Sequence, residues 1–308
     1  MGKTAFVFPG QGAQAVGMGR DIYEAFPSSR AIIDAADEAL GFRLSDIIFQ
    51  GPEELLKQTV NTQPALLAVS VAFLEALKTS GLKPDFVAGH SLGEYSALVA
   101  AGTLSFADAV RTVRARGEFM EQAVPSGQGA MAAVLGAERE ALASLCASAS
   151  AEAGAVELAN VNCPGQIVVS GTSAGVQAIV ERGKEAGAKR VIPLEVSGPF
   201  HSSLMKPAAD RLKDVLAGVE MQDATVPVIA NVTAQPVTDS GEIRKLLAEQ
   251  VYSPVLWEDS VRYLIEQGVD TFVEIGSGTV LAGLIKKIDK SVNIVPINSV
   301  EALKAAAL

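Results

Sequence analysis

Short apolar runs alternate along the chain with longer segments in which apolar residues recur at helical spacing. The first run, residues 4–8, predicts a buried strand that ends at the glycine-bracketed loop Pro9-Gly10-Gln11-Gly12. Helices are then predicted over 28–40 (capped by Ser28), from Pro52, over 64–80, and over 106–121 (capped by Ser105). The helix that begins at Pro64 is apolar on nearly every face, so we expect it at the centre of the protein.

The pattern changes after a glycine- and proline-containing linker at 124–129. Strands are predicted over 131–135, 156–161, 167–170 and 190–196, and helices over 138–148 and 173–185. The order β-α-β-β-α-β over roughly 70 residues is that of a ferredoxin-like fold. We therefore predict a small ferredoxin-like domain at 127–197, inserted into a large α/β domain formed by 1–126 and 198–308.

The chain then returns to the large domain. A helix over 204–216 and strands over 226–230 and 271–275 are predicted. The glycine loop 276–278 opens a helix that ends at Ile288, the last element the pattern predicts. The whole chain is thus expected to form a parallel-sheet core of the hydrolase-like α/β type with one small insert.

The segment Gly89-His90-Ser91-Leu92-Gly93 joins an apolar run, 86–88, to a helical one. Gly-x-Ser-x-Gly between a strand and a helix is the nucleophile-elbow pattern, in which a tight turn exposes the serine hydroxyl. The helix would direct its first free N–H groups at the same point. A plain turn that contains a serine is the alternative, but the flanking elements favour Ser91 as a nucleophile.

A serine nucleophile needs a base, and the chain has two histidines. His90 adjoins Ser91 on the elbow, so its side chain is expected to point away and to pack or donate a hydrogen bond. His201 lies in a loop where the small domain rejoins the large one, and by elimination it is the predicted base. Several core elements follow His201, unlike the late histidine of a standard α/β-hydrolase. No acidic third member stands out, so a neutral group is expected to hold the imidazole.

Three arginines lie on the helix that begins at Phe106. At about 100° per residue, Arg111 lies opposite the apolar stripe, and Arg114 and Arg116 lie at its borders. A border arginine commonly extends to solvent. The functional alternative is that one of them turns inward and binds a substrate carboxylate through two hydrogen bonds. Spacing alone leaves the choice open.

Composition excludes several classes of function. The 308 residues are 49% hydrophobic and 19% charged, as in a packed globular protein, and the net charge of −10 argues against nucleic acid as a partner. Cys146 and Cys163 are not spaced as CxxC, which suggests a reducing compartment, and no metal-ligand cluster is visible. We see neither a signal peptide nor a membrane span, so the protein is expected to be cytoplasmic and away from membranes.

Together these stretches resemble the malonyl-CoA:acyl carrier protein transacylases of fatty acid and polyketide synthesis. The matching segments occur in family order over nearly the whole chain: FVFPGQG at 6–12, TQPA at 62–65, GHSLGEY at 89–95, RGEFM at 116–120, NCPGQ at 162–166, PFHS at 199–202 and EIG at 274–276.

The resemblance implies a role for several residues. Ser91 would take the malonyl group from CoA as an ester, with His201 as base and then acid. Gln11 and the main-chain N–H of Leu92 would form the oxyanion hole, and Arg116 would be the carboxylate clamp. Gln250 matches a family glutamine that supports the histidine. Gln63, Asn162 and Phe200 belong to the matching segments and are expected to line the pocket, Phe200 fitting a malonyl-selective site.

The resemblance also implies the reaction and its partners. Malonyl would pass from malonyl-CoA to the phosphopantetheine thiol of acyl carrier protein by ping-pong kinetics, without a metal or other cofactor. We expect a monomer. Because the carrier would be acidic, a local basic patch would steer it, although these faces could equally be ordinary solvated surface. The candidates are Arg182, Lys184, Lys189 and Arg190, or Lys206, Arg211 and Lys213.

Two other functions remain open from the sequence. A serine esterase or thioesterase would use the same Ser91 and His201 with water as acceptor. Arg116 and the core elements that follow His201 argue against it. A non-catalytic scaffold protein would keep the fold but lose the nucleophile or the base, and this chain has lost neither.

Overall fold

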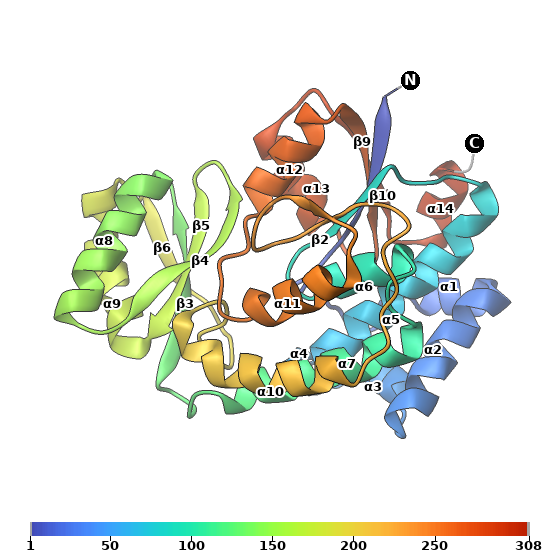
Figure 1. Cartoon of the computed structure of the whole chain (residues 1–308), viewed down its shortest axis with the longest axis horizontal. Coiled ribbons are helices and arrows are strands. Elements are labelled where there is room, and N and C mark those ends of the chain that lie inside the picture. Colours follow the sequence, from blue (N-terminus) through green and yellow to red (C-terminus); the bar gives the residue numbers. More distant parts are fainter. Residues whose placement is uncertain (1, 307–308) are drawn as a thin grey trace.

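A six-stranded sheet forms the centre of the molecule. The structure, a computed structural model, describes residues 2–306 (Figure 1). The strand order is β10-β9-β1-β2-β7-β8, and all neighbours are parallel except the antiparallel pair β7–β8. This confirms the predicted parallel-sheet core. The strands are β1 (Lys3–Phe8), β2 (Phe86–Gly89), β7 (Val228–Ile229), β8 (Pro236–Val237), β9 (Val269–Ile275) and β10 (Asn293–Ile297).

Helices surround this sheet and pack on one another (Figure 1). Those before the small sheet are α1 (Arg20–Ala25), α2 (Pro27–Leu40), α3 (Leu44–Gln50), α4 (Glu53–Lys57), α5 (Thr59–Leu77), the 3₁₀ turn η1 (Lys78–Ser80), α6 (Gly93–Ala100) and α7 (Phe106–Gln122). Those after it are η3 (Ser203–Met205), α10 (Lys206–Ala217), α11 (Ser240–Gln250), α12 (Trp257–Glu266), α13 (Val280–Ile288) and α14 (Val300–Ala306).

Helix α5 is the core helix that the sequence predicted. Nearly all its residues are buried, which is why its apolar residues occupy every face. The segment 59–80 is long and apolar enough to cross a membrane by composition, but 89% of its most apolar window is buried inside the protein. The apolar character of α5 is therefore accounted for by packing in the core.

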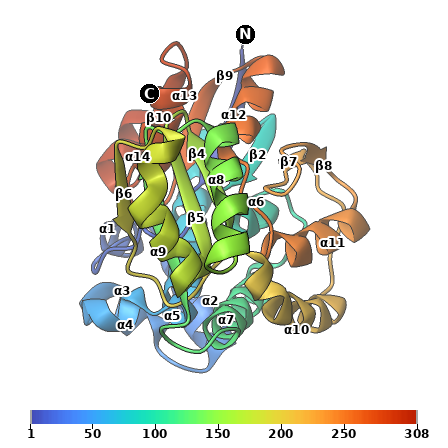
Figure 2. The same ribbon diagram turned by 90° about the vertical axis from the view of Figure 1, so that its left-hand side faces the viewer.

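The small sheet is antiparallel, with the order β4-β5-β3-β6. Helices α8 and α9 lie side by side on one of its faces (Figure 2) and share an apolar core with it. The elements fall within 127–197, the range predicted as a domain, and that domain boundary stays a prediction. They are β3 (Gly129–Leu135), α8 (Arg139–Glu152), β4 (Val156–Cys163), β5 (Gln166–Thr172), α9 (Ser173–Arg182), the 3₁₀ turn η2 (Gly183–Ala186) and β6 (Arg190–Pro193).

Two predicted helix starts are wrong. Helix α2 begins at Pro27, so Ser28 lies inside it and caps nothing. Helix α5 begins at Thr59 and contains Pro64. Proline cannot donate the hydrogen bond to the carbonyl four residues earlier, and Arg114 Nη1 donates to that carbonyl, Val60 O, at 3.0 Å instead. A tertiary contact thus allows the helix to start one turn before its proline.

The C-terminal part contains more structure than the sequence pattern predicted. Helix α13 is not the last element, because β10 and α14 follow it, and α11 and α12 were also missed. The predicted strand over 226–230 shortens to the two residues of β7. Strand β10 contains Pro296, which interrupts a strand pattern but is tolerated at a sheet edge, where no partner needs its missing N–H.

Candidate active site

Ser91 lies on the turn between β2 and α6, with a backbone φ of +51°. This left-handed conformation is rare for a residue with a side chain and is typical of functional turns. The turn requires the two flanking glycines. A Cβ at Gly89 would lie 1.9 Å from the carbonyl of Gly93, and a Cβ at Gly93 would lie 2.1 Å from Phe8 O. The elbow is therefore pressed against the end of β1, and the serine side chain faces outward.

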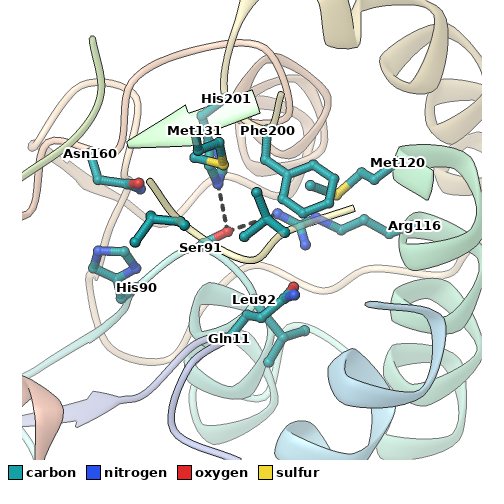
Figure 3. A pocket seen from close by; sticks show the side chains of 12 residues that line it. Gln11, His90, Ser91, Leu92, Arg116, Met120, Met131, Asn160, Phe200 and His201 are labelled. Atoms are coloured by element: carbon teal, nitrogen blue, oxygen red, sulfur yellow. Dashed lines mark hydrogen bonds between the residues drawn. The ribbon is translucent and has the colours of Figure 1, made fainter. Parts of the chain in front are cut away.

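The side chains of Ser91 and His201 are hydrogen-bonded to each other (Figure 3). Ser91 Oγ lies 2.8 Å from His201 Nε2, and His201 Nδ1 lies 2.8 Å from the main-chain oxygen of Gln250. A carbonyl oxygen only accepts, so Nδ1 carries the proton and Nε2 presents a lone pair to the serine. The group that orients the imidazole is thus a neutral carbonyl at the end of α11.

His201 is buried, and its surroundings favour the neutral imidazole. Burial first, and the nearby positive charge of Arg116 second, lower the pKa of His201 to about 3. The unprotonated form therefore predominates at neutral pH. An imidazole in that state, 2.8 Å from a hydroxyl, can act as a general base.

Of the three arginines on α7, only Arg116 turns into this site. Its side chain is 1% exposed. Nη1 donates to Gln63 Oε1 at 2.8 Å, and Nη2 donates to Gln250 Oε1 at 2.9 Å and to Ser91 Oγ at 3.1 Å. These three acceptors are neutral, and Nε has no partner within residues 2–306. The guanidinium is thus a buried cation beside the nucleophile, without a carboxylate bonded to it.

The other two arginines are occupied elsewhere. Arg114 donates to Val60 O and to Asn61 Oδ1 on α5. Arg111 is exposed and pairs with Asp108 at 3.2 Å. The packing of α7 against α5 therefore decides a choice that residue spacing left open.

Two residues of the site have main-chain N–H groups that donate to nothing recorded in the described part of the chain. One is Leu92, the residue before α6, and the other is Gln11 in the loop after β1. The Gln11 side chain points elsewhere, since its Nε2 donates to Thr59 Oγ1 at 3.1 Å. The Leu92 N–H lies at the positive end of α6, and free N–H groups are suitable donors to a developing oxyanion.

A cavity of about 120 Å³ opens over Ser91 and His201 (Figure 3). One of its walls is apolar, and Phe200 belongs to it, as predicted. Gln63 and Asn162 do not line it: Gln63 contacts Arg116 from behind, and Asn162 Oδ1 lies 2.8 Å from His90 Nε2. The lining residues are Gln11, His90, Ser91, Leu92, Arg116, Met120, Met131, Asn160, Leu194, Val196, Phe200 and His201.

Sequence reasoning missed two buried residues that support the elbow from behind. Asn231 Oδ1 accepts from the main-chain N–H of Ser91 at 2.7 Å, and its Nδ2 donates to Gly89 O at 2.7 Å. Glu94 accepts from the main-chain N–H of Asn231 at 3.1 Å and from Gln250 Nε2 at 2.9 Å. The only signal in the sequence was Glu94 itself, the one charged residue in α6.

Known proteins match this chain over nearly its full length. Residues 5–305 match the model of the acyl transferase domain family. A Bacillus subtilis (strain 168) protein named malonyl CoA-acyl carrier protein transacylase is 56% identical over 306 residues, covering 99% of this chain and 96% of that protein. A Staphylococcus aureus (strain MRSA252) protein of the same name is 51% identical, covering 99% and 98%.

Solved structures show the same fold. The crystal structure of acyl-carrier-protein-S-malonyltransferase from Bartonella henselae is 44% identical with a TM-score of 0.96, covering 99% of this chain and 98% of that one. A complex described as a type II PKS acyl-carrier protein with its malonyl-transacylase is 43% identical with a TM-score of 0.96, covering 99% of each chain. The parallel-sheet core with a small second sheet is thus common to these proteins.

Proposed function

This chain belongs to the acyl transferase family, and on that premise we propose that it moves a malonyl group from malonyl-CoA to the phosphopantetheine thiol of acyl carrier protein. It is a transferase of the malonyl-CoA:acyl carrier protein transacylase type, serving fatty acid or polyketide synthesis. The observation that best supports malonyl as the acyl group is the position of Arg116, a buried cation that donates a hydrogen bond to Ser91 Oγ.

In the first half-reaction His201 Nε2 takes the proton of Ser91 Oγ, and the oxygen attacks the thioester carbon of malonyl-CoA. The carbonyl oxygen becomes an oxyanion, which the free N–H groups of Leu92 and Gln11 stabilise. As the tetrahedral intermediate collapses, the C–S bond breaks and the CoA sulfur takes the proton from His201. The products are malonyl-Ser91 and free CoA.

The second half-reaction is the reverse with another thiol. His201 takes the proton of the carrier's thiol, the sulfur attacks the ester carbon, and Ser91 leaves with the proton returned. A thioester is replaced by a thioester, so the enzyme needs a covalent relay rather than a driving force. The protons and electron pairs balance with Ser91 and His201 alone, and we therefore propose that the reaction uses no metal or other cofactor.

Arg116 selects the acyl group. The terminal carboxylate of malonyl would accept charge-assisted hydrogen bonds from the N–H groups of the guanidinium. An acetyl group has no carboxylate and would leave the buried guanidinium without an anionic partner, at a cost of about 1–3 kcal/mol. The apolar cavity wall, including Phe200, limits the room beside the acyl chain.

A serine esterase or thioesterase would use the same Ser91–His201 pair with water as acceptor. It is not favoured, because the full-length relatives are named transacylases. We also propose that the chain acts in the cytoplasm as a monomer, in line with the sequence-based expectation.

Intact-mass spectrometry after brief incubation with malonyl-CoA tests the proposal. We expect the wild type to gain one malonyl group and pass it to carrier protein, whereas Ser91→Ala gains none and acetyl-CoA labels the wild type far less. Steady release of CoA by the wild type without any adduct or transfer would instead indicate a hydrolase.

A further inference from the structure

Glu94 is a buried carboxyl group that the mechanism above does not use. It lies in the first turn of α6, three residues after the nucleophile, and is 2% exposed. Oε2 accepts from Gln250 Nε2 at 2.9 Å and from the main-chain N–H of Asn231 at 3.1 Å. It therefore touches neither Ser91 Oγ nor His201, but it contacts the glutamine that contacts Arg116.

The side-chain amide of Gln250 lies between one donor on its oxygen side and three acceptors on its nitrogen side. Oε1 accepts from Arg116 Nη2 at 2.9 Å. Nε2 donates to Glu94 Oε2 at 2.9 Å, to Ser91 O at 3.0 Å and to Asn231 Oδ1 at 3.2 Å. A flipped amide would direct its NH₂ group at the Arg116 guanidinium and its oxygen at three other oxygens. The observed orientation is thus the one that holds Arg116, and the carboxyl group is the Nε2 acceptor at the shortest distance.

We propose that Glu94 is the positioning residue of the carboxylate clamp. By accepting from Nε2, it fixes the Gln250 amide with Oε1 toward Arg116, and this holds the guanidinium beside Ser91 where an acyl carboxylate binds. Glu94 thereby contributes to the preference for carboxylate-bearing acyl groups without touching the substrate. The inference rests on the proposed function and adds a residue to it.

Electrostatics agree with this geometry. Burial raises the pKa of Glu94 to about 7, while the hydrogen bonds from Asn231 and Gln250 and the charge of Arg116 oppose that rise. A buried carboxylate is costly to desolvate. Each group that offsets the cost at Glu94 contacts the nucleophile or lies beside it.

Glu274 provides a matched control. It is fully buried, and burial raises its pKa to about 7 as well. Its oxygens accept from the main-chain N–H groups of Leu281 at 3.0 Å and Ala282 at 2.8 Å, at the start of α13. It has no recorded bond to a residue of the active site within 2–306, so its replacement reports the cost of losing a buried carboxyl group alone.

The test compares two reagents on the same variants. Malonyl-CoA needs the clamp. An uncharged alkyl fluorophosphonate needs the Ser91–His201 pair but has no carboxylate for the clamp: His201 takes the Ser91 proton, Ser91 Oγ bonds to phosphorus, and the P–F bond breaks to release fluoride. Both reagents label only folded enzyme, so the ratio of their single-turnover rates on Ser91 does not depend on the folded fraction. A merely structural defect lowers both rates and leaves the ratio unchanged.

Replacement of Glu94 by methionine removes the acceptor and keeps a similar volume. We expect Glu94→Met to lower the ratio of malonyl to fluorophosphonate labelling about 10- to 100-fold, the size of effect that misplacing a binding group produces. Glu94→Gln should stay within about threefold of wild type, since its amide oxygen can accept from both donors. Glu274→Met should leave the ratio at the wild-type value. If Glu94→Met does not fold, Glu94→Asp, with its carboxylate drawn back, should lower the ratio in the same direction.

A double-variant cycle shows whether Glu94 acts through Gln250. The ratio for Glu94→Met combined with Gln250→Met should equal that for Gln250→Met alone, because the second change removes the side chain through which the first acts. An unchanged ratio in Glu94→Met, or fully additive losses in the double variant, would overturn the inference while leaving the proposed function intact. A wild type that takes no malonyl would overturn the proposed function, and this inference with it.

Discussion

At the scale of single residues, Arg116 acts on both the nucleophile and the base. Arg116 donates to Ser91 Oγ and contributes to the low pKa of His201, which burial lowers first. A depressed imidazole pKa keeps the base unprotonated, so catalysis is retained as the pH falls below 6.5, the ordinary value for histidine. The same arginine can therefore bind an anion and keep its neighbouring base unprotonated.

This arrangement predicts the pH dependence of nucleophile labelling. With the uncharged fluorophosphonate, the acid limb of the wild type should lie well below pH 6.5, because His201 loses its function only when protonated, at a pKa of about 3. Arg116→Met removes a positive charge and should move the limb upward. Rates after brief pH jumps measure it.

Arg114→Met is the matched control for that experiment. Arg114 lies on the same helix, but it donates to Val60 and Asn61. Its replacement should leave the acid limb where it is in the wild type. A wild-type limb near 6.5, or equal shifts in both variants, would contradict the assignment.

At the scale of elements, the contact between α7 and α5 places the clamp. A Cβ at Gly117, next to Arg116, would lie 2.9 Å from both Thr59 O and Val60 Cα. Helices α5 and α7 thus approach closely at Gly117, where any side chain on α7 would clash with the backbone of α5. The exposed Gly283 in α13 has no such neighbour, since a Cβ there would meet nothing within 4 Å.

These two glycines predict opposite effects of the same substitution. Gly117→Ala should lower the free energy of unfolding by about 1–3 kcal/mol through overpacking, and it should slow malonyl labelling by displacing Arg116. Gly283→Ala should raise the free energy of unfolding by roughly 0.5–1 kcal/mol, because alanine loses less backbone entropy in a helix. Urea unfolding and the malonyl-labelling rate measure both. A tolerated Gly117→Ala would show that the helix contact does not set the clamp.

At the scale of the whole molecule, the acidic carrier expected from the sequence would need a local basic patch, because the net charge of the chain is −10. Lys206 and Arg211 are exposed on α10, the helix that starts five residues after His201. They lie over the rings of Tyr252 and Phe119, at 5.8 and 4.1 Å, and neither has a carboxylate partner among the described residues. Beside the small sheet, Arg182 pairs with Glu152 and Glu185. Lys213 on α10 is likewise paired, with Asp210 at 3.7 Å. Lys206 and Arg211 are the α10 candidates without such a partner within residues 2–306, and they lie next to the segment of His201.

Charge reversal tests this docking surface. Lys206→Glu with Arg211→Glu should raise the Michaelis constant for carrier protein roughly tenfold at low salt, and the effect should shrink as salt is added. Malonyl labelling from CoA should not change. Steady-state kinetics with carrier protein varied measures both. Lys184→Glu with Lys189→Glu places the same charges beside the small sheet, and a larger effect there would move the docking surface to that part of the chain.

The sequence by itself determined features that depend on neighbours along the chain. The elbow at 89–93 is a local turn that needs its glycines. The cap at Ser105, which accepts from the N–H of Asp108 at 3.1 Å, is likewise local. The strand and helix order of the small sheet followed from periodicity, and His201 followed by elimination, since the chain has one other histidine.

Tertiary structure decided the features that depend on distant segments. The carbonyl that orients His201 lies 49 residues away at Gln250. Every residue type has a main-chain carbonyl, so no residue in the sequence marks the one that will lie beside the imidazole. Arg116 was singled out by the packing of α7 on α5, and Asn231 reaches Ser91 across 140 residues. Strand β10, which contains a proline, became a strand because β9 offers it an edge. Local turns and periodicity are encoded by adjacent residues, whereas hydrogen bonds between remote segments exist only after the chain has folded.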